Sequence, residues 1–338
     1  MNHLKKTGAI RRTRTAVVVG ALGLSMLAAC GGSSSDGASG GGKRTVAFVM
    51  GASADPFFKA MKVGAEAEAK AKGVDLIWEG DTSEYSPATQ IPIVDQVLAK
   101  QPSALVLIPT DPDALQAVVT KATASGMPVL NVDTQVSDLS DVTSFITGDN
   151  ADGGAKAADA IATAIGYEDT GSYQVVVGLT SNTATTNVAR LEGFKAQIAA
   201  KYPNIEIVDT AYSQSKPEVA NTNVNNWLTK YPDLSGIFAI DGSNATGSAA
   251  ALQAKDLVGK VALVGYDAYP DNVALLQQGV FTALIAQDPA QEARLAIDYA
   301  IAKLDGDTSS IEHEVTIPNV VLTQDTSAED FATYTYFS

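Results

Sequence analysis

The sequence predicts an α/β fold with two similar domains, each built around a mainly parallel β-sheet. From Arg44 onward, short runs rich in β-branched residues alternate with stretches of helical periodicity, which is typical of β-α-β units. The alternation starts again after Thr147, although no residue-level repeat accompanies it. The 338 residues are also enough for two domains of ordinary size, each with its own core.

The first half of the chain contains strands separated by helices with recognisable ends. Pro56 opens the first helix and Gly73 ends it. The second helix opens at Pro87 with Ser86 as its N-cap, and Asp111 is expected to cap the third. The strands of this half are predicted at Thr45–Met50, Val74–Trp78, Ala104–Ile108 and Val129–Val132.

The second half repeats the same alternation. Its strands are predicted at Tyr173–Gly178, Ile205–Asp209, Gly236–Ile240, Val261–Gly265 and Phe281–Ala286, followed by Val315–Leu322. Its helices are predicted at Ala151–Ile165, Asn187–Lys201, Pro217–Lys230, Ser243–Lys255, Asp271–Gln278 and Pro289–Leu304.

Residues 1–29 have the pattern of a secretion signal. Basic residues come first, and the apolar run from Ala16 to Ala29 is too short to span a bilayer. The run ends in Leu27-Ala28-Ala29-Cys30, which resembles the signal of bacterial lipoproteins. We therefore expect cleavage before Cys30 and lipid on this residue, the only cysteine in the chain. A buried core cysteine is the alternative, but the Gly/Ser tract that follows does not suit it.

A flexible tether is predicted at residues 30–43, because 31–42 is nearly all Gly, Ser and Ala. Its mean reach is about 20 Å, so the folded body would stay close to a membrane surface. Removing residues 1–29 leaves 18 basic against 38 acidic residues, a formal net charge of −20. Such a surface repels nucleic acid and anionic lipid.

Polar residues follow almost every predicted strand. The carboxyl ends of parallel strands meet at one edge of a sheet, where ligands bind. Asp133, Asp241, Asp267 and Gln287 are predicted ligand contacts, because none is followed directly by proline or an obvious helix start. A role as helix caps or loop residues is the alternative for these aspartates, and it is the expected one for Asp111.

Aromatic and basic residues complete this candidate site. Carboxylates and amides beside aromatic rings suit a polyhydroxylated ligand, since rings cover the C–H face of a sugar. Arg190, preceded by Asn187, could fork to ring and hydroxyl oxygens, with a surface ion pair to Glu192 as the alternative. The candidate aromatics are Phe57, Phe58, Trp78, Tyr85 and Tyr266, of which Phe58 also fits the core face of its helix.

Seven short motifs occur in the order seen in one family. They are Asp55-Pro56-Phe57-Phe58, Ile108-Pro109-Thr110-Asp111, Val132-Asp133-Thr134, Gly148-Asp149-Asn150, Arg190-Leu191-Glu192-Gly193-Phe194, Val264-Gly265-Tyr266-Asp267 and Ile285-Ala286-Gln287. In this order the chain resembles the ribose-type periplasmic sugar-binding proteins, which are the solute receptors of ABC importers. The resemblance runs from about Arg44 to the C-terminal region.

The resemblance implies two doubly wound parallel-sheet domains joined by a three-crossover hinge, with a ligand cleft between them. The crossovers are expected near Gly148, after Gln287 and near Pro318. The domains would be 44–148 plus 288–317 and 149–287 plus 318–338. The ligand contacts that match by position are Asp55, Phe57, Phe58, Asp133, Asp241, Tyr266, Asp267 and Gln287.

Some positions depart from the ribose-type pattern. Asp55 and Asp241 stand where those proteins usually have Asn, and Thr134 stands where they place an arginine. Arg190 matches the second of two family arginines, and Val188 occupies the position of the first. We therefore do not expect specificity for ribose itself.

The predicted function is a monomeric, lipid-anchored receptor outside the cytoplasm that needs no cofactor or metal. It would capture a neutral sugar or polyol by hinge closure and deliver it to an ABC permease and its ATPase. A sensor with the same fold, binding a nucleoside, an inositol or a small signalling molecule, is an alternative, and four cleft carboxylates leave cationic compounds open. An extracellular glycosidase with two carboxylates is a further alternative. The chain has only His3 and His313 and no Gly-x-Ser-x-Gly motif, so catalysis is not expected.

Overall fold

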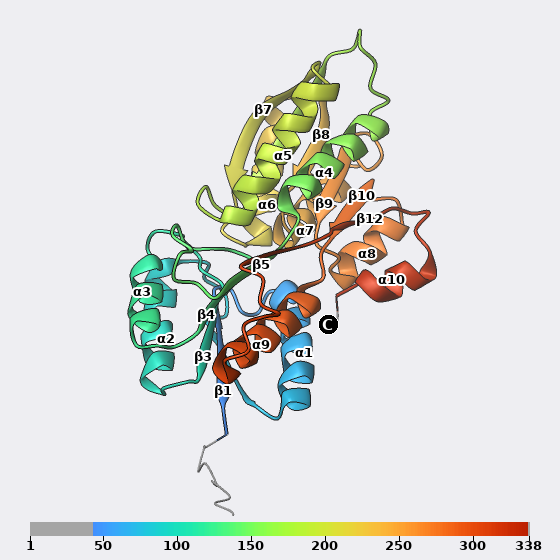
Figure 1. Ribbon diagram of the computed structural model, residues 1–338. Coiled ribbons are helices and arrows are strands. Elements are labelled where there is room, and N and C mark those ends of the chain that lie inside the picture. Colours follow the sequence, from blue (N-terminus) through green and yellow to red (C-terminus); the bar gives the residue numbers. More distant parts are fainter. Residues whose placement is uncertain (1–42, 337–338) are drawn as a thin grey trace, which may run out of the picture. The chain divides into compact units, whose positions relative to one another are not determined.

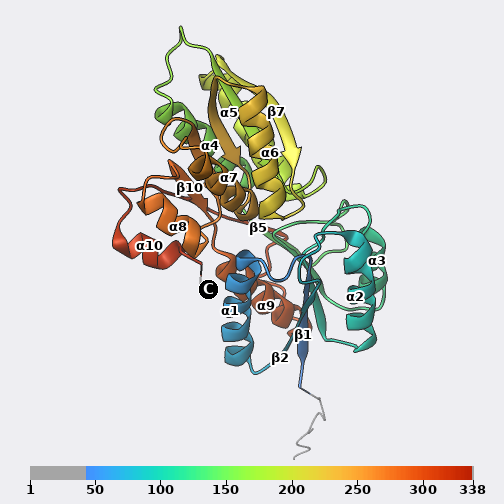
Figure 2. The same ribbon diagram turned by 180° about the vertical axis from the view of Figure 1, so that it is seen from behind.

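Two six-stranded sheets, each with helices on both faces, make up residues 43–336, which are the residues that the computed structural model describes (Figures 1 and 2). The predicted signal, Cys30 and residues 30–42 of the predicted tether lie outside them. Within 43–336, no helix has both the length and the apolar character needed to cross a membrane.

The first sheet is entirely parallel. Its strands are β1 (Thr45–Met50), β2 (Asp75–Gly80), β3 (Ala104–Leu107), β4 (Val129–Val132), β5 (Ser144–Gly148) and β11 (Glu314–Ile317). They lie in the order β11-β5-β4-β3-β1-β2. Helices α1 (Pro56–Lys72), α2 (Pro87–Ala99), α3 (Gln116–Ala124) and α9 (Pro289–Asp305) pack on this sheet. We call this sheet with its four helices the first lobe.

The second sheet has the equivalent order, β12-β10-β9-β8-β6-β7, and only β12 is antiparallel to its neighbour. Its strands are β6 (Tyr173–Leu179), β7 (Ile205–Tyr212), β8 (Leu234–Ala239), β9 (Ala262–Tyr266), β10 (Ala283–Ala286) and β12 (Val320–Leu322). Its helices are α4 (Asn150–Ala164), α5 (Thr185–Lys201), α6 (Pro217–Lys230), α7 (Gly242–Ala254), α8 (Pro270–Gln277) and α10 (Ala328–Tyr334). We call this sheet with these helices the second lobe.

The central strands are buried on both faces, which explains their unbroken apolar sequences. In β1, Phe48 and Met50 belong to the core cluster that contains residues of α1 and α9. The alternate residues Ala47 and Val49 belong to the cluster formed with α2 and α3. In β8, Phe238 likewise belongs to the cluster with α4 and α5, whereas Ile237 and Ala239 belong to the cluster with α6 and α7. Each lobe is therefore doubly wound, as predicted.

Glycines bring α4 and α5 into close contact. A Cβ atom at Gly154 of α4 would collide with the backbone carbonyl of Arg190 in α5. A Cβ atom at Gly193 of α5 would collide in the same way with the carbonyl of Ala151 in α4. This close packing fixes the backbone that carries Arg190, and it needs a residue without a side chain at both positions.

The chain crosses between the sheets three times, as the resemblance implied. It passes from β5 into α4, from β10 into α9 and from β11 into β12. The connecting residues lie at Asp149, Gln287–Asp288 and Pro318–Asn319. These crossings confirm the fold class and place the hinge beside the carboxyl ends of the strands.

Some predicted elements were wrong. The segment predicted as one strand at Val315–Leu322 forms two strands in different sheets, and Pro318, which has no N–H to donate to a ladder, stands between them. Strand β5 and helix α10 were not predicted. Helix α3 begins at Gln116 with no side-chain cap, and Asp111 instead accepts from the N–H groups of Asp113 and Ala114 in the preceding turn.

Candidate functional site

A cavity lies between the two lobes at the carboxyl ends of their strands. The first lobe contributes its loops after β1 and β4, and the second lobe contributes the residues after β6, β8 and β9. The lining residues are Asp55, Phe57, Phe58, Tyr85, Asp133, Thr180, Ala184, Thr186, Asn187, Arg190, Ser215, Asp241, Asp267, Tyr269 and Gln287. Nine of the ten ligand-binding residues predicted from the sequence are in this set, and Tyr266 is not.

Asp133 and Asp267 occupy equivalent places in the two lobes. Each follows the fourth strand of its sheet, and each has a positive φ, +61° and +67°. Their N–H groups donate to Ile146 and Ile285, on the neighbouring strands, at 2.9 and 2.8 Å. Positive φ is uncommon outside glycine but is tolerated by aspartate, so the left-handed turn sets both carboxylates at the sheet edge.

The carboxylate of Asp267 is fully engaged by protein donors. Its Oδ1 accepts from Gln287 Nε2 at 2.8 Å and from the Tyr336 hydroxyl at 3.0 Å. Its Oδ2 accepts from the N–H of Gly242 at 3.0 Å. With 4% of its surface exposed, Asp267 is a fixed acceptor that also holds the hinge residue Gln287 in place.

The carboxylate of Asp133 has no such partners. The side chain is 9% exposed, and the hydrogen bonds found within residues 43–336 include none to its carboxylate oxygens. Burial raises the pKa of Asp133 above its ordinary value, while the nearby Arg190 guanidinium opposes the rise. Asp133 is therefore free to pair with a ligand.

Arg190 is buried at the wall of the cavity. Its Nε donates to Asn150 Oδ1 at 2.8 Å, and Nη1 donates to the carbonyl of Ile240 at 3.0 Å. Its Cζ lies 3.7 Å from the ring centroid of Tyr266, a cation-π contact. The surface ion pair with Glu192 was wrong, because Arg190 is 3% exposed and Glu192 pairs with Lys195 instead.

Two of the predicted residues, Tyr266 and Asn187, make contacts that hold neighbouring groups of the cavity wall in place. Tyr266 is fully buried under Arg190, and its hydroxyl accepts from Asn319 Nδ2 at 2.6 Å. Asn187 lines the cavity, and its Oδ1 accepts from the N–H of Thr180 at 2.6 Å. The structure therefore places Tyr266 under the guanidinium rather than at the cavity surface.

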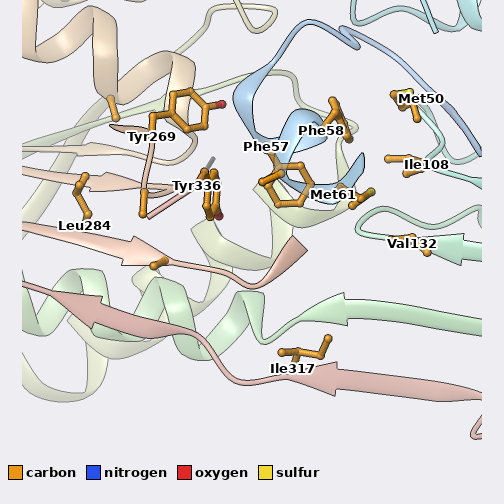
Figure 3. Packing of buried hydrophobic residues seen from close by; sticks show 14 of the residues in the cluster. Met50, Phe57, Phe58, Met61, Ile108, Val132, Tyr269, Leu284, Ile317 and Tyr336 are labelled. Atoms are coloured by element: carbon orange, nitrogen blue, oxygen red, sulfur yellow. The ribbon is translucent and has the colours of Figure 1, made fainter. Parts of the chain in front are cut away.

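Aromatic rings from both lobes pack together beside the cavity, and Figure 3 shows Phe57, Phe58, Tyr269 and Tyr336 close to one another. Phe57 and Phe58 of α1 meet edge to face, with ring centroids 5.3 Å apart. Tyr336 lies 6.0 Å from Phe57 and 6.0 Å from Tyr269, again between ring centroids. Phe58, which also fits the core face of its helix, lines the cavity together with Phe57.

Two of the predicted aspartates also act as helix caps. Asp55 caps α1 by accepting from the N–H of Phe57 at 2.9 Å. Asp241 caps α7 by accepting from the N–H of Asn244, so the expectation of no helix start after Asp241 was wrong. Burial raises the pKa of Asp241, and it raises the pKa of Asp55 to about 7.

Two side-chain contacts join the first lobe to the second near the cavity. The hydroxyl of Tyr269 donates to Asp55 Oδ1, and Lys216 Nζ lies 3.0 Å from Glu84 Oε1. These bonds connect the second lobe to the first, so the structure holds the lobes against each other.

Sequence reasoning missed several lining residues. Tyr269 was the main one, although it stands two residues after Asp267 and directly before Pro270, which opens α8. The hydroxyls of Thr180, Thr186 and Ser215 also line the cavity. Thr180 and Ser215 lie in loops and Thr186 lies in the first turn of α5, and none of the three belongs to a sequence motif. Within 43–336 no group of three or more His, Cys, Asp or Glu side chains could hold a metal ion.

Comparison with known proteins identifies the family. The family model described as "Periplasmic binding protein domain" matches residues 46–308. The chain belongs to this periplasmic binding protein family. It is 32% identical over 285 residues to Ribose import binding protein RbsB of Salmonella typhimurium, covering 82% of this chain and 91% of that protein. The Xylitol-binding protein of Mycolicibacterium smegmatis is 28% identical over 306 residues, with 90% and 82% covered.

One solved structure has a closely similar fold. The solute-binding protein of an ABC transporter from Agrobacterium vitis, bound with alpha-D-tagatopyranose, superposes with a TM-score of 0.81 at 30% identity. The match covers 88% of this chain and 100% of that one. The predicted resemblance to ribose-type periplasmic sugar-binding proteins is thus confirmed. These relatives are extracytoplasmic binding proteins of transport systems and not enzymes.

Proposed function

We propose that this protein is the solute receptor of an ABC importer and that it captures a sugar or polyol in the cavity between its lobes. The observation that carries the proposal is the composition of that cavity. Carboxylates and amides from the ends of four strands face aromatic rings from α1, which is the pairing that a polyhydroxylated ring requires. The ribose-binding, xylitol-binding and tagatose-bound relatives support this ligand class.

We propose that the ligand is bound by closure of the two lobes, because the residues that would contact it belong to both lobes. Asp133 belongs to the first lobe and Arg190 to the second, so a ligand touches both only when the lobes are together. A ligand that binds the closed state better shifts the population toward it. We propose domains at 44–148 plus 288–317 and at 149–287 plus 318–338, with the three crossings as the hinge.

The site residues have distinct proposed roles. Asp133, Asp267, Arg190 and Gln287 would hydrogen-bond the ligand, and Phe57 with Phe58 would cover its apolar face. Tyr266 would act through Arg190 by supporting the guanidinium. The remaining predicted contacts are Asp55, Asn187 and Asp241.

The location proposed for the receptor is the outer face of the cell membrane, with lipid on Cys30 and delivery of ligand to a permease and its ATPase. A Cys30→Ser variant should lose incorporation of radiolabelled palmitate and leave the membrane fraction. If the variant still incorporated palmitate and stayed in the membrane fraction, the proposed lipid anchor on Cys30 would be rejected.

The test of ligand class is thermal unfolding of the full chain in detergent against pentoses, hexoses, polyols, inositols, nucleosides and amino acids. A ligand present at 100 times its dissociation constant stabilises the folded state by about 2.7 kcal/mol, which is a shift of several degrees. A shift with a sugar or polyol supports the proposal. A shift only with nucleosides or amino acids would reject this ligand class, and turnover of a glycoside would revive the glycosidase alternative.

A further inference from the structure

The cavity has many more acidic than basic groups. Among residues 43–336, four carboxylates line it, from Asp55, Asp133, Asp241 and Asp267, against one guanidinium, that of Arg190. Two of the four are already satisfied by protein donors. Asp267 accepts three hydrogen bonds, and Asp241 accepts from Thr180 Oγ1 at 2.7 Å and twice from Asn244.

The other two carboxylates keep free acceptors. In the described residues, Asp133 receives no hydrogen bond on its side chain although nine-tenths of its surface is buried, and it faces the cavity. Asp55 uses Oδ1 for the N–H of Phe57 and the hydroxyl of Tyr269, which leaves Oδ2 free within the described residues. A buried carboxylate without a partner is costly, so a bound group should compensate it.

No neighbouring residue within 43–336 donates a hydrogen bond to these free oxygens. Thr134 is buried and donates its hydroxyl to the carbonyl of Pro109, and Val188 is 41% exposed and carries no charge. Lys216 is paired with Glu84 outside the inner cavity. Burial raises the pKa of Asp133 and the charge of Arg190 lowers it, but the hydrogen bonds of Arg190 go to Asn150 and Ile240, and this one guanidinium faces four carboxylates.

We propose that the ligand is a carbohydrate bearing a basic nitrogen, an amino sugar or amino polyol, whose ammonium group sits against Asp133. This inference rests on the proposed function and replaces the neutral ligand expected from the sequence. An ammonium group offers three N–H donors and one positive charge, which match the free oxygens of Asp133 and Asp55. The hydroxyls of the same ligand would meet Arg190 and Gln287.

The test is calorimetric titration of the full chain with matched pairs that differ by one amine. The pairs are D-glucosamine against D-glucose, D-galactosamine against D-galactose, and 1-amino-1-deoxy-D-sorbitol against D-sorbitol. We expect at least one amine to bind tenfold or more tightly than its neutral partner. Equal or tighter binding of every neutral partner would overturn this inference and keep the proposed function. Binding by no carbohydrate would overturn both.

Two variants that each remove one negative charge test whether the preference for the amine over its neutral partner arises in the cavity. Asp133→Asn removes the charge and suits the positive φ, which asparagine tolerates. It should bring the amine and its neutral partner to within about threefold of each other. Asp141→Asn removes one charge from an exposed residue that does not line the cavity, and it should leave the tenfold preference intact. An unchanged preference in Asp133→Asn would contradict the proposed contact.

Discussion

Removal of one hydroxyl should weaken closure of the cleft. The Tyr269 hydroxyl of the second lobe donates to Asp55 of the first, and both residues line the cavity. Tyr269→Phe keeps the buried ring and its contact with Tyr336 but removes this donor. The bond forms only when the lobes meet, so its loss should lower the ratio of closed to open molecules.

The size of the effect follows from the charge of the acceptor. A hydrogen bond to an ionised group contributes about 1.5 to 3 kcal/mol, and each 1.4 kcal/mol is a factor of ten. Burial raises the pKa of Asp55 to about 7, so near neutral pH the carboxyl is only partly ionised and the lower end applies. We therefore expect the closed fraction and the ligand affinity to fall by up to about tenfold.

The assay is calorimetry with the best ligand from the thermal panel, combined with small-angle scattering of the ligand-free protein. Tyr202→Phe is the matched control, because the Tyr202 hydroxyl also donates to a carboxylate, Asp159, at 2.7 Å, but within the second lobe. The control should lose thermal stability and keep its affinity. Unchanged affinity and unchanged scattering in Tyr269→Phe would refute the reasoning.

Three further perturbations have expected outcomes. Gly154→Ala should lower the melting temperature by several degrees because its Cβ would collide with the backbone of Arg190, and an unchanged melting curve would contradict the close packing of α4 and α5. Lys216→Ala should weaken binding less than threefold, measured by calorimetry at low salt, because the ion pair with Glu84 is partly exposed; a tenfold loss would contradict this. The pKa of Asp55 is about 7 in the folded state against an ordinary value of 3.8, so folded molecules hold more protons between these values, and stability should fall as pH rises through this window. Asp55→Asn should flatten that decline in pH-dependent melting curves, and an unaltered slope would count against the assignment.

The sequence predicted the two sheets because their central strands are buried and several of their helices begin at clear signals. Pro56, Pro87 and Pro217 each open a helix as expected, and the apolar runs at β1 and β4 coincide with the strands. Strand β5, Ser144–Gly148, was missed because it contains only two apolar residues, Phe145 and Ile146, and follows a polar loop.

Periodicity could not show where the chain changes sheets. Apart from Pro318 and Asn319 at its centre, the segment Val315–Leu322 has the composition of a single strand, and its two parts pair with β5 and with β10. Such long-range pairing is a property of the tertiary fold and leaves little trace in the local sequence.

The candidate site was only partly predictable from the sequence. Polar residues at strand ends converge in any parallel sheet, which placed Asp133 and Asp267 at the cavity. Whether a side chain is satisfied by its neighbours depends on distant segments. Asp267 is held by Gln287 and by Tyr336 near the C-terminus, whereas Asp133 meets no such donor in the described residues.

The most direct test of the account is a crystal structure of the protein with the best carbohydrate from the thermal panel. The account predicts ligand density in the cavity, in contact with Asp133 of the first lobe and Arg190 of the second, with Phe57 against the ring. Ligand bound elsewhere, or touching one lobe only with the cleft open, would contradict capture of the ligand by closure.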